Sequence, residues 1–305
     1  TCALPICDVV VLTFPSDWSQ AGPTLDAARR AAGIEEPRLV RVLDVGVDAG
    51  THFVVEESLS GAESLRQLVH DGGIEAEQAR RITGEAASAL ATAAARGLHH
   101  GRLTPHDVQV LPGGAVKVGG LATAAALAGQ EDLPAEVASR IDTTALVAIL
   151  YAALTGRWPL PGSDVGLEPA PRVGGTVAAP SELTAGVGGD LDRLALLVLS
   201  AAGDRAAASA SDRDLPDRRG VSAADARTTA AHADLAPRDP AHLVALLAPW
   251  AGAPSPGTAI RAGAAAELPP SRPVPMRTDP APRPSPAGEE SEDPGRAADR
   301  PLDTV

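Results

Sequence analysis

Short runs rich in valine, separated by turn-forming residues, characterise the beginning of the chain. Runs of this kind are typical of β-strands. They predict strands at 8–14, 39–47 and 51–56, and a turn at 48–50 that joins the last two. A helix is predicted between the first two strands, at 24–32, with Thr24 as its N-cap.

After position 60, apolar residues recur three and four positions apart, which indicates amphipathic helices. They are predicted at 74–96, 142–155, 191–200 and 240–248. The segment 142–155 is apolar on nearly all sides, so we expect a buried helix that begins at Asp142 and ends at Gly156. A block of strands followed by a block of helices predicts an α+β fold, because parallel α/β sheets alternate the two.

Other stretches lack the pattern of a folded core. Residues 203–219 have low complexity and are expected to loop out, and 251–305 are rich in proline, glycine and charge and are expected to be a disordered acidic tail. Residues 1–7 hold both cysteines but lack the features of a signal peptide, so we expect a ragged end. The only methionine is Met276, so residue 1 is not expected to be the translational start.

Composition limits the classes of partner. The chain has 305 residues and a formal net charge of −13, which argues against nucleic acid as a partner. No uninterrupted run of about 18 apolar residues occurs, so we expect no membrane span. Three histidines lie close together at 99, 100 and 106, but no further cysteine, histidine or carboxylate stands at metal-binding spacing, so no metal site is expected.

Three segments carry a resemblance to a known family. Residues 98–108 (Leu-His-His-Gly-Arg-Leu-Thr-Pro-His-Asp-Val) resemble the catalytic loop H-R-D-L-K-P-S-N-V of eukaryotic-like Ser/Thr protein kinases of actinobacteria, with His100, Leu103 and Pro105 in place. Residues 53–57 with 64–65 are similar to the kinase hinge, and 142–157 to the central helix of the larger kinase lobe. The resemblance implies a protein-kinase-like bilobal fold, with a truncated N-lobe sheet at 8–57 and a mainly helical C-lobe at 58–250.

The residues that perform phosphoryl transfer in that family are replaced. The catalytic Asp corresponds to Arg102, the metal-binding Asn to Asp107, and the Asp of the D-F-G triplet to Gly120. The strand lysine falls at Thr13, and its partner glutamate would fall near Asp26 or Ala27. Thr104 replaces the loop lysine, no A-P-E triplet follows, and the glycine-rich loop is not found upstream of position 8.

Kinase catalysis relies on Mg²⁺, a lysine and an Asp to position the reacting groups. Their replacement leads us to expect a pseudokinase that is not an enzyme, needs no cofactor and acts by binding proteins. The alternative is an atypical Ser/Thr kinase or a nucleotide-binding regulatory domain, with weak, Mg²⁺-independent ATP binding through Glu57 and Arg102. Arg102 could instead pair with a nearby carboxylate. The resemblance gives His100 a packing role and lets Asp142 accept hydrogen bonds from the backbone of the loop. Trp158 is expected to be a core anchor.

The sequence His-Gly-Arg-Leu at 100–103 is also similar to the pseudokinase associated with actinobacterial MviN proteins, which act in peptidoglycan precursor export. That likeness implies a forkhead-associated domain as partner, with phosphorylated Thr278 in the tail as the group it would recognise. The alternative, which we favour from the sequence, is that Thr278 is an ordinary linker residue. The expected location is the cytoplasm, or the inner face of the membrane through a partner.

Overall fold

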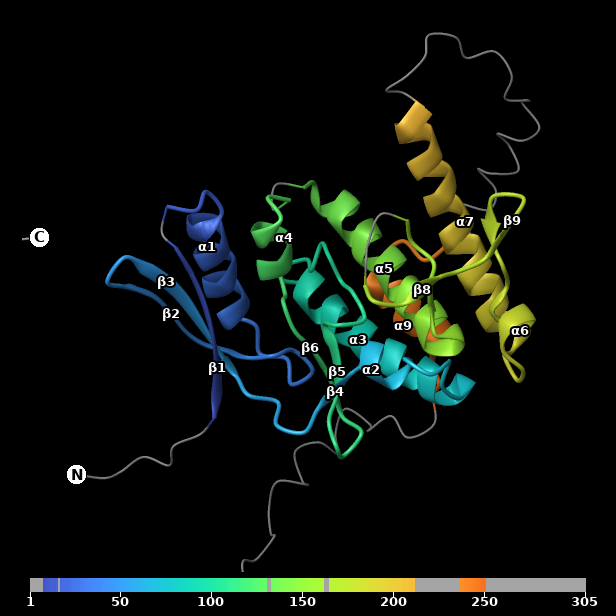
Figure 1. Ribbon diagram of the computed structural model, residues 1–305, viewed down its shortest axis with the longest axis horizontal. Helices are drawn as coiled ribbons and strands as arrows, with labels where there is room; N and C mark the ends of the chain where they lie inside the picture. Colours follow the sequence, from blue (N-terminus) through green and yellow to red (C-terminus); the bar gives the residue numbers. More distant parts are fainter. Residues whose placement is uncertain (1–7, 16, 131–132, 162–164, 212–235, 251–305) are drawn as a thin grey trace, which may run out of the picture. The chain divides into compact units, whose positions relative to one another are not determined.

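The computed structural model describes residues 8–15, 17–130, 133–161, 165–211 and 236–250 (Figure 1), with side chains at 201 and 203–211 left out. By internal contacts the chain divides into two units, Thr1–Pro254 and Ser255–Val305. All described residues belong to the first unit. The expectations for residues 1–7 and for the tail at 251–305, Thr278 included, therefore lie outside the described residues.

A three-stranded antiparallel sheet forms the first lobe. Its strands are β1 (Val9–Pro15), β2 (Val42–Asp48) and β3 (Thr51–Glu57), in the order β1-β3-β2. The helix α1 (Ala21–Ala32) packs on this sheet through a small core centred on Leu25 and Val54. The predicted strands and the turn between the last two are confirmed to within three residues.

The second lobe is mainly helical and contains only short strands. Its helices are α2 (Leu65–Leu68), α3 (Ala76–Ala94), α4 (Thr123–Leu127), α5 (Ala135–Thr155), α6 (Pro180–Leu183), α7 (Gly189–Ser211) and α9 (Pro240–Leu247). A second three-stranded sheet contains β4 (Glu63–Ser64), β5 (Val108–Val110) and β6 (Val116–Val118). Two strand pairs complete the lobe: β7 (Arg157–Trp158) with β8 (Glu168–Pro169), and β9 (Arg172–Val173) with β10 (Thr176–Val177).

The central helix α5 is the core of the second lobe. Residues 145–154 are almost completely inaccessible to solvent, and α3, α7 and α9 pack around the helix. By length and composition α5 is apolar enough to cross a membrane, but 72% of its most apolar window is buried within the fold. Burial also raises the pKa of Tyr151 to about 12, and the Tyr151 hydroxyl donates a hydrogen bond to the carbonyl of Ala178 at 3.0 Å. The prediction of a buried helix over 142–155 is confirmed.

The predicted starts and ends of several helices were wrong. The helix α1 begins at Ala21, and Thr24 is buried inside it, because Pro23 lies in the first turn, where proline is tolerated. The helix α5 begins at Ala135, seven residues before Asp142, which is engaged elsewhere. The helix α7 continues to Ser211 through part of the segment expected to loop out; the rest of that segment, from 212, lies outside the described residues.

Backbone hydrogen bonds connect the two lobes. The N–H of Val40 donates to the carbonyl of Val118 at 2.9 Å, and the N–H of Val118 donates to the carbonyl of Arg38 at 2.7 Å. An ion pair between Lys117 on β6 and Glu57 at the end of β3 lies beside them. The first lobe is thus attached directly to the strand that precedes Gly119 and Gly120.

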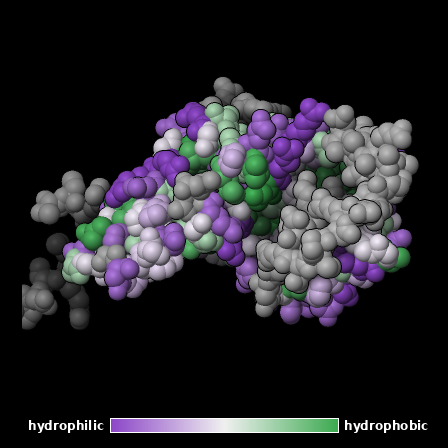
Figure 2. All heavy atoms as spheres, turned by 90° about the horizontal axis from the view of Figure 1, so that it is seen from above, coloured by the Kyte–Doolittle hydropathy of each residue, from purple (hydrophilic) through white to green (hydrophobic). Residues whose placement is uncertain are grey.

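Some hydrophobic side chains remain at the surface. Viewed from above, hydrophobic surface lies among hydrophilic residues near the middle of the molecule (Figure 2). Exposed large apolar residues include four consecutive positions on β1, Val9 to Leu12, and a second set on and beside α4 and α5, which comprises Leu127, Leu133 and Val137. Exposure of consecutive residues on β1 shows that both faces of this edge strand are partly open.

Candidate functional site

The loop 98–107 is held in place by a buried carboxylate. Asp142, on α5, is 1% exposed. Its Oδ2 accepts a hydrogen bond from the N–H of His100 at 2.9 Å, and its Oδ1 accepts one from the N–H of Gly101 at 2.7 Å. The expected hydrogen bond between Asp142 and the loop backbone is therefore present. This use of both oxygens explains why Asp142 lies inside a helix instead of capping one.

His100 connects the loop to the end of β6. Its ring is completely buried, Nε2 lies 2.8 Å from the carbonyl oxygen of Gly119, and Nδ1 accepts from the N–H of Arg102 at 3.3 Å. If Nδ1 accepts, Nε2 carries the proton and donates to Gly119. The ring joins two segments, which agrees with the packing role expected for His100.

Asp107 closes the other end of the loop. Its Oδ2 accepts from both the N–H and the hydroxyl of Thr104, at 2.7 and 2.8 Å. Its Oδ1 forms no hydrogen bond among the described residues. A Cβ added at Gly120 would lie 3.6 Å from that oxygen. Oδ2 of Asp107 therefore holds the loop in its conformation, and Oδ1 faces Gly120.

A pocket of about 480 Å³ lies between the two lobes, and we call it the interlobe cleft. One wall comes from β1 and the end of β3, and the other from the loop, the end of β6 and α4. Its acidic lining residues are Glu56, Glu57 and Asp107, and none of the described lining residues is a lysine or an arginine. The remaining lining residues are Val10, Leu12, Val40, Ser58, Leu59, His106, Gln109, Gly119, Gly120, Thr123, Ala124 and Leu127.

The two glutamates of the cleft have different surroundings. Burial raises the pKa of Glu56, and the negative charge of Glu57 raises it further. Glu57 is an ion-pair partner of Lys117 and accepts a hydrogen bond from the N–H of Arg41 at 2.9 Å. Of the two predicted nucleotide contacts, Glu57 therefore lines the cleft with its carboxylate already engaged, and Arg102 does not line the cleft.

The residue of β1 that faces the cleft is not Thr13, the position that we assigned to the kinase strand lysine. Val10 and Leu12 line the cleft, and Thr13 does not. Alternate residues of a strand point to the same face, so Leu12 occupies the inward position at the place where a lysine was sought. Asp26, a candidate for the partner glutamate, forms an exposed ion pair with Arg29 at 2.7 Å.

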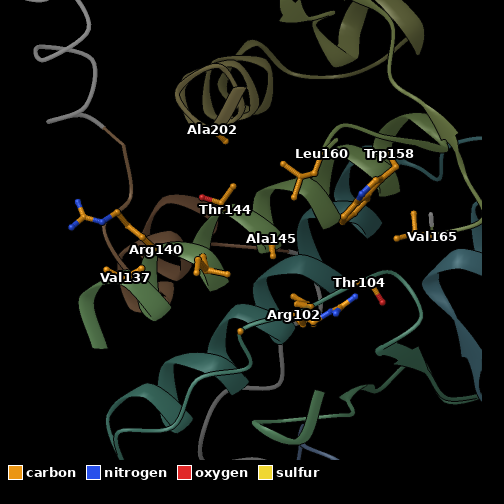
Figure 3. A pocket seen from close by; sticks show the side chains of 13 residues that line it. Arg102, Thr104, Val137, Arg140, Thr144, Ala145, Trp158, Leu160, Val165 and Ala202 are labelled. Carbon is orange, nitrogen blue, oxygen red and sulfur yellow. The ribbon is translucent and has the colours of Figure 1, made fainter. Parts of the chain in front are cut away.

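A second pocket, of about 730 Å³, lies on the other side of the same loop, and we call it the α5 pocket. Figure 3 shows Arg102 and Thr104 at one end and Arg140 with Val137 at the other, with the side chains of the two arginines directed away from each other. No carboxylate is found among its described lining residues. The others are Gly101, Leu103, Ile141, Thr144, Ala145, Trp158, Leu160, Val165 and Ala202. Sequence reasoning missed this pocket, because its walls come from distant segments.

Within the described ranges, no group of three or more histidine, cysteine, aspartate or glutamate side chains is placed to hold a metal ion. Of the replaced catalytic positions that line the interlobe cleft, Asp107 offers a carboxylate. Gly120 contributes none, and its positive φ of 72° is one that glycine adopts without strain.

The chain has a protein-kinase-like α+β fold with two lobes. Its defining features are two three-stranded antiparallel sheets, a central buried helix, and a loop that this helix holds beside a cleft. No family model matches the chain. The chain is similar to the Ser/Thr protein kinases PknB of Mycobacterium leprae (28% identical over 57% of this chain and 32% of the relative) and PrkC of Bacillus subtilis (26% over 45% and 24%). PknB of Mycolicibacterium smegmatis is 28% identical over 57% of this chain and 32% of its own length.

The chain spans a quarter to a third of the length of these curated relatives. A solved structure of Rad53 residues 1–466 in complex with AMP-PNP matches with a TM-score of 0.42 and 20% identity, over 52% of this chain and 44% of that chain. The sequence matches support the expected relationship to eukaryotic-like bacterial kinases.

One expectation has to be corrected. From the replaced residues we expected a protein that is not an enzyme, but the curated relatives are all named Ser/Thr protein kinases. These matches point to the kinase enzyme class. The replaced side chains concern a few positions, whereas the similarity to the two PknB kinases extends over 57% of this chain.

Proposed function

We propose that this chain is an atypical kinase-like regulatory domain that binds a nucleotide in the interlobe cleft, mainly through the base and ribose. The observation that carries the proposal is the cleft itself. Its volume of about 480 Å³ is within the usual range for small-molecule sites, and Val10, Leu12 and Val40 give it apolar surface on which a base can pack. Polar groups of Gln109 and Ser58 line the same cavity.

The charges of the cleft determine which part of a nucleotide contributes affinity. Phosphates carry negative charge, and the described lining residues offer carboxylates and no lysine or arginine. Mg²⁺ prefers an octahedral set of oxygen ligands. Among the described lining residues, one oxygen of Asp107 and one of Glu57 are already engaged, and burial raises the pKa of Glu56, which favours its neutral form. The proposal therefore includes weak binding with little dependence on Mg²⁺ and little gain from the phosphates.

Phosphoryl transfer, the activity named for the relatives, would depend on Asp107 in this chain. Neutralising the charge of the transferred group requires a metal ion or a cation, and Asp107 offers its unengaged oxygen, Oδ1, beside Gly120 in the cleft. If labelled phosphate is transferred from ATP, Asp107→Ala, which removes both side-chain oxygens, should reduce it by orders of magnitude. If the variant still transferred phosphate at the original rate, Asp107 would not be the residue that binds the metal ion.

Calorimetric titration of the purified chain with adenosine, ADP and ATP, each with and without Mg²⁺, tests the proposal. We expect the three dissociation constants to agree within about threefold, a difference below 1 kcal/mol. In Gly119→Leu, binding should be lost, because a Cβ at this position already lies 3.6 Å from Val40 and a longer side chain extends into the cleft.

The matched control is Gly113→Leu, at a turn where an added Cβ meets nothing within 4 Å. This variant should bind like the original chain. No binding of any of the three ligands, or equal binding by the Gly119→Leu variant, would refute a nucleotide site in the cleft.

A second proposal concerns protein partners and rests on the resemblance of the loop at 100–103 to MviN-associated proteins. We propose a role near peptidoglycan precursor export, with a forkhead-associated domain that captures phosphorylated Thr278. Tail peptides spanning Arg277 to Pro280, with and without phosphate on Thr278, should be offered to forkhead-associated domains. Capture of the phosphorylated form alone is expected, and equal capture of both peptides would contradict the proposal.

A further inference from the structure

The α5 pocket has the features of a binding site that no part of the described fold uses. Arg102 is exposed in it, and its guanidinium forms no hydrogen bond or ion pair among the described residues. Pairing with a nearby carboxylate, one of the two alternatives considered from the sequence, is therefore not observed in this part of the chain. A guanidinium presents five N–H donors, so Arg102 can bind an external anion.

The rest of the pocket has the same charge preference. Arg140 also lines it, and the partner of Arg140 is Glu136, at 4.0 Å in an exposed pair. Exposed pairs with this geometry contribute little. With two arginines and no carboxylate among its described lining residues, the pocket favours a negatively charged ligand.

Trp158 provides an independent observation. It is 4% exposed and lines the pocket, and its indole Nε1 is buried without a hydrogen-bond partner among the described residues. A buried N–H is normally paired, since leaving one without an acceptor costs free energy. The side chain of Trp158 is directed toward the pocket in Figure 3, so an acceptor atom of a ligand could reach this donor.

Apolar surface surrounds these donors. Val137 is 41% exposed, and Ile141 and Leu160 are partly exposed beside it. The ligand that fits therefore has an oxygen anion and an apolar group a short distance apart. A peptide with an acidic side chain next to a large apolar side chain has this combination.

We propose that the α5 pocket docks an acidic peptide segment of a partner protein, with an Asp or Glu carboxylate on Arg102 and an adjacent apolar side chain against Val137 and Leu160. A carboxylate is favoured over a phosphate because a single guanidinium pairs with a carboxylate through two parallel N–H···O bonds, whereas sites for phosphorylated residues gather several arginines. Arg102 and Arg140 point in different directions and do not form such a cluster. This proposal does not depend on nucleotide binding.

The test begins with a displayed library of random peptides, selected on the full chain. We expect enrichment of Asp or Glu beside Leu, Ile or Phe. Binding of an enriched peptide should weaken at least tenfold in Arg102→Gln, and less in Arg140→Gln. The matched control is Arg29→Gln, an exposed arginine of the first lobe, which should leave binding unchanged.

A direct readout comes from the three tryptophans of the chain. With ¹⁵N-labelled tryptophan, the indole N–H signal of Trp158, assigned through Trp158→Phe, should shift on addition of the peptide, while that of Trp18 stays in place. A peptide with phosphoserine in place of the acidic residue is added in parallel.

Three results would overturn the proposal: no enrichment of acidic residues, tighter binding of the phosphoserine peptide, or a binding loss in Gly119→Leu with none in Arg102→Gln. The last would move the site to the interlobe cleft. Circular dichroism of each variant establishes that it is folded.

Discussion

The two pockets beside the loop 98–107 differ in the sign of their charge. The interlobe cleft is lined by three carboxylates and no described lysine or arginine, whereas the α5 pocket is lined by two arginines and no described carboxylate. Residues 101–104 line the α5 pocket, and residues 106–107 line the cleft. One short loop therefore separates a cleft whose described charged lining residues are acidic from a pocket whose described charged lining residues are basic. Arg102, which we predicted from the sequence to stand in place of the catalytic Asp, lines the α5 pocket.

The largest expected effect comes from removing the carboxylate that supports both pockets. In Asp142→Ala, the N–H groups of His100 and Gly101 lose their buried acceptor. Because each unpaired buried N–H costs about 1–3 kcal/mol, the free energy of unfolding should fall by about 3 kcal/mol. Denaturation with urea measures the change.

Asp142→Asn keeps one acceptor oxygen, so its free energy of unfolding should fall by less than that of Asp142→Ala. If Asp142→Ala were as stable as the original chain, the loop would be held by other contacts, and the two pockets would not share a support.

The acidic character of the cleft can be increased at Gly120. Gly120→Asp places a second carboxylate near Oδ1 of Asp107, with neighbours no closer to the added Cβ than 3.4 Å. The left-handed backbone should cost about 1 kcal/mol of stability. A pair of carboxylates can hold Mg²⁺, so ATP should bind this variant more tightly with Mg²⁺ than without it. The dissociation constant should differ on the order of tenfold, which corresponds to the free energy of one charge-assisted contact.

Gly120→Asn has the same shape and backbone strain without the charge, and it should not gain this dependence. Titration of both variants with ATP, with and without Mg²⁺, makes the comparison.

The smallest effect concerns pH. The pKa of Glu56 is raised from 4.5 by burial, so the folded state holds this proton more tightly than the unfolded state. Glu56 therefore contributes to the stability of the folded state at acidic pH, and this contribution is lost as the pH rises through the pKa that Glu56 has in the folded state. Glu56→Gln, which is neutral at every pH, should therefore raise the melting temperature at neutral pH and leave it almost unchanged at about pH 4. An equal effect at both pH values would contradict the assigned cause.

Much of this arrangement could be predicted from the chain alone. The strands of the first lobe and the buried helix over 142–155 follow from local patterns, and the contact between Asp142 and the loop follows from the resemblance to kinases. The residue that faces the cleft from β1 could not be fixed, because a shift of one position between Leu12 and Thr13 reverses the face of the strand.

The start of α5 was missed for a related reason. Asp142 has the composition of an N-cap, but its carboxylate binds a loop 41 and 42 residues away in the sequence. Tertiary contacts decide between these roles, and a local pattern does not contain them. The α5 pocket was hidden in the same way, since Arg102, Arg140 and Trp158 come together only in the folded chain.

The backbone bonds between Val40 and β6 have a consequence for how occupancy of the cleft can be observed. The amide hydrogen of Val40 is bonded to Val118, one residue before the glycine pair, and Val40 itself lines the cleft. Its exchange with deuterated solvent requires the first lobe to separate locally from β6. The exchange rate of this single amide therefore measures how often the lobes part, and a ligand that bridges them should slow it.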